Sequence, residues 1–292
     1  MTTLEKTHAQ DFSVTKTHKP IGAVIENIDL TQPLNRHQFY QLQQAWNEHH
    51  ILIFKGQTLT DYNLFNFATY FGDVFHPPVD VPVLASNTDG AAPAVVPVSN
   101  QQGGYTGSGE LTPHIDHQWT PRPSKASFLY ALEVPSTGGD TSWYNLALAY
   151  DTLDEETKQQ IAHLTLFTYN PFARRAAGST KFTRYFDPAN PPFGLAFSHP
   201  LVTTHPESGK KILYISRDTE VRIPELSLEE GKALIEKLRS HAFCDELRYE
   251  HKWQVGDVVL WDNRSTAHSR TAFPETEIRN LHRISLAGQR PL

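Results

Sequence analysis

Two histidines and one aspartate have types and a spacing that favour metal chemistry. His114 and Asp116 lie two residues apart in TPHIDHQW, and His268 follows much later in WDNRSTAHSR. Side chains two apart on an extended strand project from the same face, whereas His117 would point the other way. Two imidazoles and a carboxylate can form a facial triad that leaves positions of an octahedral Fe(II) open for substrate and oxygen. Because His-x-Asp is short and occurs by chance, other residues must support this interpretation.

A threonine and two arginines at set distances provide that support. Thr141 lies in STGGDTSW, 27 residues after His114, and Arg279 and Arg283 follow His268 by 11 and 15 residues. Residues four apart on a strand share a face, so the two arginines would point together into a barrel. Buried arginines are costly unless they meet anions. A dicarboxylate co-substrate would supply one, because a guanidinium binds a carboxylate through two charge-assisted hydrogen bonds.

Composition excludes several other classes of protein. The 292 residues are 39% hydrophobic and 20% charged, and the net charge of −6 disfavours nucleic-acid binding. No apolar run approaches the roughly 20 residues of a membrane-spanning helix, and we expect a cytoplasmic protein with a small-molecule substrate and no membrane partner. The single cysteine, Cys244, cannot form an internal disulfide or a thiolate cluster, so any metal must be held by histidines and carboxylates.

The elements that must position these residues are mostly short strands. Helical spacing and caps predict helices over 35–50, 60–71, 153–164 and 227–241, the second ended by Gly72 and the last opened by a capping box from Ser227 to Glu230. Short β-branched or aromatic runs predict strands over 21–25, 51–54, 128–134, 211–216, 249–253, 257–261 and 280–286. We therefore predict a mainly β fold with peripheral helices, with a jelly roll or barrel at its core.

The chain reads as one domain. Residues 1–20 are polar and without periodicity, so we expect a flexible N-terminal arm before a single domain over 21–292. Residues 77–109 are rich in Pro, Gly, Asn and Ala and are too long for a simple connector. Such segments are usually functional, and we expect a lid over the substrate mouth.

The sequence as a whole resembles the taurine and chlorophenoxyacetate dioxygenase (TauD/TfdA) family of Fe(II)/2-oxoglutarate-dependent oxygenases. The segments that carry the resemblance include GAVIENIDLTQPL, ILIFKGQTLT, VPSTGGDTSWYN, WQVGDVVLWDNR and RNLHRISLAGQRPL. The resemblance implies a double-stranded β-helix core, with Fe(II), 2-oxoglutarate and O2 as the reacting partners. It also implies that His114, Asp116 and His268 bind iron, and that Arg279 and Thr141 bind the distal carboxylate of 2-oxoglutarate.

Two positions refine this expectation. Relatives such as taurine dioxygenase commonly have Trp directly before the first histidine, where this chain has Pro113, so the wall of the substrate site is altered. The iron-binding carboxylate, Asp116, is intact, whereas related halogenases replace it with a small residue. Hydroxylation of a C–H bond is therefore favoured over halogenation.

The nature of the substrate stays open between an acid and an amine. The counterparts of Arg283 and His76 in the taurine enzyme contact its substrate, which implies a sulfonate or an aryloxy or alkyl carboxylate. Glu110, by contrast, lies four residues before His114, where it could bind an amine. Further candidates for the site are Asp218 and Glu220 as amine ligands, and Phe172 and Phe75 as an apolar wall. An amino acid or another amine-bearing metabolite is thus the alternative substrate.

Two rival classes fit parts of the pattern. The same triad could hold zinc in a metal-dependent hydrolase or isomerase, although Arg279 and Thr141 argue against it, because a hydrolase needs no dicarboxylate clamp. A non-catalytic jelly-roll binding protein would also have this fold, but it leaves the joint presence of His114 and Asp116 unexplained. From the family resemblance we also expect a homo-oligomer.

Overall fold

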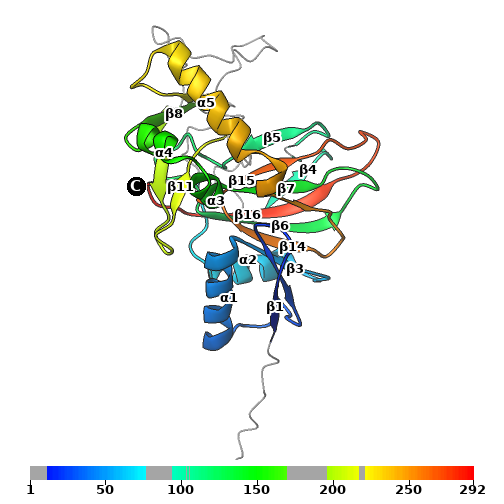
Figure 1. The fold of residues 1–292 in the computed structure, drawn as a ribbon. Coiled ribbons are helices and arrows are strands. Elements are labelled where there is room, and N and C mark those ends of the chain that lie inside the picture. The colour runs from blue at the N-terminus through cyan, green and yellow to red at the C-terminus, as the bar shows by residue number, and fades with distance from the viewer. Residues whose placement is uncertain (1–11, 77–93, 103, 105, 170–195, 217–220) are drawn as a thin grey trace, which may run out of the picture.

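Two facing β-sheets with helices on their outer sides form the centre of the molecule (Figure 1). The computed structural model describes residues 12–76, 94–102, 104, 106–169, 196–216 and 221–292. The larger sheet has, in spatial order, β1 (Ser13–Lys16), β2 (Ala23–Glu26), β3 (Ile51–Phe54), β14 (Val258–Asp262), β6 (Ala126–Glu133), β16 (Asn280–Leu286) and β4 (Val96–Ser99). The smaller sheet has β13 (Arg248–His251), β7 (Thr141–Asn145), β15 (Thr266–Arg270) and β5 (Leu111–His114). The predicted mainly β jelly roll with peripheral helices is confirmed.

Short strands beside the two sheets complete the β structure. A three-stranded sheet has the order β12 (Val221–Arg222), β8 (Thr165–Tyr169) and β9 (Ala196–Pro200), and a hairpin joins β10 (Val202–Thr204) to β11 (Lys211–Leu213). All pairings in the described parts of the sheets are antiparallel except that of β2 with β3.

The helices begin where side-chain caps satisfy their first backbone N–H groups. They are α1 (Arg36–His49), α2 (Asp61–Thr69), α3 (Leu146–Asp151), α4 (Glu155–Ile161), α5 (Leu228–Ala242) and the 3₁₀ turn η1 (Asp245–Leu247). Asn35, Thr60 and Ser227 open α1, α2 and α5 through reciprocal capping boxes. The capping box predicted for α5 is thus present. None of the helices in the described residues is long and apolar enough to cross a membrane.

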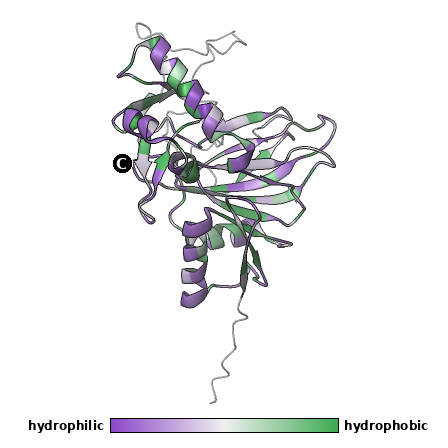
Figure 2. Cartoon of the chain, in the orientation of Figure 1, coloured by the Kyte–Doolittle hydropathy of each residue, from purple (hydrophilic) through white to green (hydrophobic). Residues whose placement is uncertain are grey.

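Three apolar layers hold the elements together. α1 and α2 cover the outer face of the larger sheet, where Trp46 and Phe67 join the same cluster as Phe128 (Figure 1). The space between the two sheets is filled by a second cluster that includes Trp143 and Trp261. A third cluster joins α3, α4 and α5 to the smaller sheet. Figure 2 shows polar residues on the exposed side of α1 and apolar residues along the strands that it faces. The inner layer is the one that borders the functional residues.

Three parts of the fold differ from the sequence predictions. β1 lies within the segment expected to be an arm, and its four side chains are all exposed, so no apolar alternation marks it as a strand. β4 lies within the segment 77–109 and pairs with β16 at the edge of the larger sheet. Residues 77–93 are outside the described residues, so the lid stays a prediction. The helix expected over 153–164 is the shorter α4, and α3, only six residues long, was not predicted.

Candidate functional site

Neighbouring strands bring the two histidines of the predicted triad together. His114 ends the edge strand β5 and is the direct cross-strand partner of His268 in β15, and their ring centroids lie 4.2 Å apart. The Oδ1 of Asp116 lies 3.8 Å from His114 Nε2, and its Oδ2 lies 3.9 Å from His268 Nε2. One ligand atom from each residue falls within 4.8 Å of the other two. The three side chains therefore converge on one point, as the sequence predicts.

Asp116 reaches this point from a turn and not from the predicted extended strand. β5 ends at His114, and His117 has a φ of 60°, which turns the chain. The backbone N–H of Asp116 donates to Asn263 Oδ1 (3.0 Å), and Asn263 Nδ2 donates to the carbonyl oxygens of Asp116 (2.9 Å) and Ser124 (2.8 Å). Asn263 is completely buried. Its amide thus holds both polar backbone groups of the aspartate in place.

His117 points away from the triad, as predicted from its place one residue after Asp116. Its Nδ1 lies 3.1 Å from Ser124 Oγ, and its ring stacks on Phe75 with centroids 4.2 Å apart. Burial lowers the pKa of His117 to about 4, so the ring is neutral at neutral pH. It supports the turn that carries Asp116.

The protonation states of the triad fit a divalent metal ion. His114 Nδ1 lies 2.8 Å from the carbonyl oxygen of Thr112, which can only accept, so Nδ1 carries a hydrogen and Nε2 is the nitrogen that faces the triad. Burial, and then the charge of His114, lower the pKa of His268 to about 3. Burial raises the pKa of Asp116, but Arg283 and the nearby histidines outweigh it and hold that pKa below its ordinary range. An ionised carboxylate and neutral imidazoles are the forms that ligate metals.

A second polar site is built around Thr141 and Arg279. Thr141 begins β7, and Arg279 directly precedes β16. Arg279 Nη2 donates to Thr141 Oγ1 (3.3 Å) and its Nε donates to the carbonyl oxygen of Gly139 (2.9 Å), while Trp253 Nε1 also donates to Thr141 Oγ1 (2.9 Å). Burial, followed by the positive charge of Arg270, lowers the pKa of Arg279 to about 9. The guanidinium therefore stays charged at neutral pH, although it has only neutral partners in the described residues.

Gly139 gives Arg279 the room it occupies. Its φ is +70°, and a Cβ on this residue would lie 3.0 Å from Arg279 Cδ and 2.9 Å from Pro135 Cγ. A glycine is therefore needed both for the backbone conformation and for the approach of the arginine. The second glycine of the STGGDTSW motif thus contributes directly to this site.

Both arginines reach the predicted polar site, although the two do not share one extended strand, because Arg279 precedes β16 and the register shifts between Asn280 and Leu281. Arg283 Nη1 donates to Asp116 Oδ2 across 3.3 Å, so this arginine reaches the triad. Leu281, between the two arginines, is fully buried in the cluster between the sheets. Arg283 in β16 thus borders the metal-ligand candidates, and Arg279, just before β16, borders Thr141.

Most of the predicted substrate contacts are not brought to the triad. Glu110 and His76 are exposed, and neither makes a hydrogen bond or an ion pair with the triad in the part of the chain that the structure describes. Phe75 lies against His117 instead. Phe172, Asp218 and Glu220 lie outside the described residues. Among the substrate-contact candidates that the structure describes, only Arg283 contacts the triad.

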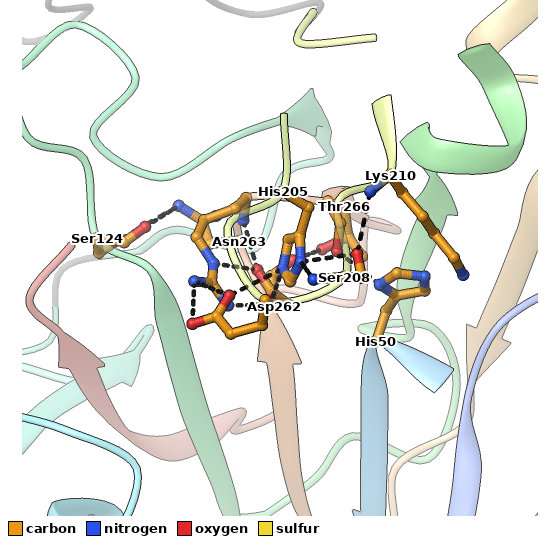
Figure 3. A network of polar contacts seen from close by, with 11 residues as sticks. His50, Ser124, His205, Ser208, Lys210, Asp262, Asn263 and Thr266 are labelled. Atoms are coloured by element: carbon orange, nitrogen blue, oxygen red, sulfur yellow. Dashed lines mark hydrogen bonds and ion pairs between the residues drawn. The ribbon is translucent and has the colours of Figure 1, made fainter. Parts of the chain in front are cut away.

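The turn between β14 and β15 contains functional residues that the sequence reasoning missed. Besides Asn263, they include Asp262, the last residue of β14, whose Oδ2 lies 2.9 Å from His205 Nε2 (Figure 3) and 2.6 Å from Arg264 Nη2. Ser265 Oγ lies 2.8 Å from His50 Nδ1. The polar run WDNRS is visible in the sequence, but the role of its residues depends on contacts with residues that are far away in sequence.

A jelly roll with a His-Asp-His triad next to a buried arginine and threonine defines a class of metal-dependent oxygenases. Residues 13–285 match the family described as "Taurine catabolism dioxygenase TauD, TfdA family". The chain belongs to this family. It is a 2-oxoglutarate-dependent dioxygenase that uses Fe(II), 2-oxoglutarate and O2 to hydroxylate a C–H bond of a small organic substrate. This confirms the predicted class of reaction and its cofactors.

Characterised relatives match this chain over nearly its whole length. It is 29% identical to the alpha-ketoglutarate-dependent 2,4-dichlorophenoxyacetate dioxygenase of Cupriavidus pinatubonensis, over 92% of this chain and 95% of the relative. It is 31% identical to an alkylsulfatase of Acinetobacter baylyi, over 99% of this chain and 89% of the relative. Among solved structures, AAD-2 in complex with Mn(II) and N-oxalylglycine superposes with a TM-score of 0.79 at 29% identity, covering 97% of this chain and 99% of AAD-2.

Proposed function

We propose that His114, Asp116 and His268 bind the Fe(II), and that Arg279 and Thr141 bind the distal carboxylate of 2-oxoglutarate. The observation that carries this proposal is the arginine at the far end of the site. Arg279 is 2% exposed, and its hydrogen bonds go only to neutral oxygen atoms in the described residues. A carboxylate placed there would satisfy the charge of a buried guanidinium, which is expensive without an anion.

Each residue has a defined task in this proposal. His114 and His268 would each offer one imidazole nitrogen to the metal, and Asp116 would add one negative charge. When bound, Fe(II) together with 2-oxoglutarate and O2 supplies the oxidising chemistry. The chain positions the reactants, because Asn263 holds the backbone of Asp116 and Thr112 fixes the hydrogen of His114 on Nδ1. The buried cluster between the sheets excludes water from this side of the site.

We infer that the substrate is a small anion, such as an aryloxy or alkyl carboxylate, a sulfonate or a sulfate ester. Arg283 supports this inference, because its guanidinium lies beside the triad and is largely buried. The relatives named above act on 2,4-dichlorophenoxyacetate and, by name, on alkyl sulfates, which are anionic. The exposed position of Glu110 gives no support to an amine-binding site. An amino acid or another amine-bearing substrate is the alternative that the assay must include.

Release of succinate from 2-oxoglutarate tests the proposal. The purified protein with Fe(II) and ascorbate under air is incubated with no substrate and with sulfonates, aryloxyalkanoates, alkyl sulfates and amino acids in turn. We expect an anionic compound to accelerate succinate release, and stimulation by amino acids alone would reject the anionic class. His268→Ala should abolish turnover with and without substrate. Full activity of that variant would contradict the assignment of His268 as a metal ligand. Hydrolysis of a test compound without release of succinate would favour the zinc-hydrolase alternative.

A cytoplasmic location and a homo-oligomeric assembly remain predictions. Cell fractionation tests the first, and light scattering of the purified protein tests the second.

A further inference from the structure

A third arginine, which the proposed function does not use, lies at the far end of the site. Arg270 is the last residue of β15, two residues beyond His268, so both side chains project from the same face. In the pairing of β15 with β7, Arg270 is directly opposite Thr141. Directly opposed residues have Cβ atoms about 4.5–5.5 Å apart on one face of the sheet. Arg270 is therefore the immediate neighbour of the threonine that Arg279 contacts.

The hydrogen bonds of Arg270 leave most of its guanidinium unsatisfied. Its Nη2 donates to the carbonyl oxygens of Gly107 (2.7 Å) and Gly109, and its Cζ lies 5.3 Å from the ring centroid of Phe273. Its Nε and Nη1 are buried and have no hydrogen-bond partner among the residues that the structure describes. The residue is only 5% exposed, and no carboxylate of the described residues pairs with it. A buried cation with two unpartnered donor nitrogens is expected to meet an anion from outside the described residues.

The two buried arginines border Thr141 from different strands. Arg279 approaches it from the start of β16, whereas Arg270 lies opposite it on β15. The positive charge of Arg270 repels that of Arg279 and lowers the pKa of Arg279. A carboxylate between the two guanidiniums would turn this repulsion into two attractions. A carboxylate also has two oxygen atoms and about four acceptor sites, enough for donors from both arginines and the threonine.

We propose that Arg270 is a second arginine of the 2-oxoglutarate site and that the distal carboxylate lies between Arg270 and Arg279. This inference rests on the proposed function, because it places the other end of 2-oxoglutarate at the triad. The spacing agrees, since residues two apart on a strand are separated by about 6.7 Å, so Arg270 lies one such step from His268. The five-carbon chain of 2-oxoglutarate is of comparable length. Arg270 would therefore select a 2-oxo acid that carries a second carboxylate.

The alternative is a purely structural role, in which Arg270 only ties residues 107–109 to β15. The two roles separate when two 2-oxo acids are compared. Pyruvate has the same carboxylate and keto group for the metal as 2-oxoglutarate but lacks the distal carboxylate. A residue that contacts the distal carboxylate changes the binding of 2-oxoglutarate alone. A residue that holds a loop changes the binding of both acids or of neither.

Calorimetric titration of the Mn(II)-loaded protein without oxygen measures this difference directly. We expect Arg270→Gln to raise the Kd of 2-oxoglutarate about tenfold or more and to leave the Kd of pyruvate unchanged. Arg279→Gln is the positive control and should weaken 2-oxoglutarate at least as strongly. Arg248→Gln, on strand β13, is the matched control, because Arg248 already pairs with Asp245 and Glu250. It should change neither Kd.

The outcomes distinguish this inference from the proposed function. If Arg279→Gln reduces the preference for 2-oxoglutarate but Arg270→Gln does not, the role of Arg270 is rejected and the site assignment stands. If Arg279→Gln keeps the full preference, the proposed 2-oxoglutarate site itself is wrong. Arg270→Lys retains the charge with a single donor group, so it should fall between wild type and Arg270→Gln. If Arg270→Gln does not fold, a wild-type Kd ratio in Arg270→Lys overturns the inference.

Discussion

The strongest test of how the triad is positioned is a change at Asn263, which does not belong to the triad. Asn263→Ala removes the amide that accepts from the N–H of Asp116 and donates to the carbonyl oxygens of Asp116 and Ser124. Each lost hydrogen bond costs about 1 kcal/mol net, and more where the partner stays buried and unpaired. The unfolding free energy should therefore fall by about 3 kcal/mol. Because Asp116 would lose its fixed orientation, metal affinity should fall about 10–100-fold.

Two measurements on each variant separate stability from metal binding. Urea denaturation of the metal-free protein gives the unfolding free energy, and competition with a chelator gives the affinity for Mn(II). Asn145→Ala is the matched control, because Asn145 is also buried and bonds to two backbone groups, the carbonyl of Pro20 and the N–H of Leu148. It should lower stability by about 2 kcal/mol without changing metal affinity. If Asn263→Ala is destabilised yet binds Mn(II) like wild type, Asn263 does not position Asp116.

Two further predictions concern the ends of the site. Burial raises the pKa of Asp262, but Arg264 and His205 outweigh burial and hold this pKa below its ordinary range. The stabilisation from the ionised carboxylate is therefore fully present above the pKa that Asp262 has in the unfolded chain, and it decreases as pH falls below that value. Asp262→Asn should thus lower the unfolding free energy by about 3 kcal/mol or more at pH 7 and reduce its dependence on acid pH, as urea denaturation at several pH values would show. Gly139→Ala places a Cβ against Arg279 at a φ of +70° and should destabilise the protein by about 1 kcal/mol or more. Because Arg279 would be displaced, calorimetric titration should also show weaker binding of 2-oxoglutarate. Unchanged binding would contradict the close approach of Gly139 to Arg279.

The sequence predicts the chemistry of the site better than its geometry. The types and spacing of His114, Asp116 and His268 are enough to predict a triad, because few residue types ligate iron. Their proximity depends on the pairing of β5 with β15, which joins residues more than 150 positions apart. The extended strand predicted from the sequence names the three residues that converge but not how they do so, since Asp116 lies in a turn in which His117 has a positive φ. A positive φ at a histidine has no clear signal in the sequence.

The residues that the sequence missed have meaning only through distant contacts. Arg270 lies two positions after a predicted ligand, but nothing in its neighbourhood indicates that its guanidinium is buried without an anion. That fact depends on the register of β15 against β7 and on the carbonyl groups of residues 107–109. Asp262 likewise pairs with His205, which is 57 residues away. Periodicity and local motifs indicate which face of a helix or strand is buried. They do not indicate which elements pack against that face.

The turn after β14 links the stability of the fold to the position of the proposed metal ligands. Asp262 anchors this turn to His205 (Figure 3). The side chain of Asn263 donates to the backbone carbonyl of Asp116. The strand that follows carries His268, so the carboxylate and the second histidine are both positioned from the same turn. Changes in the turn should therefore reduce stability and metal binding together. Changes at Gly139 or Arg270, at the opposite end of the inner face, should instead act mainly on 2-oxoglutarate, because these residues contact Arg279 or Thr141 and not the triad.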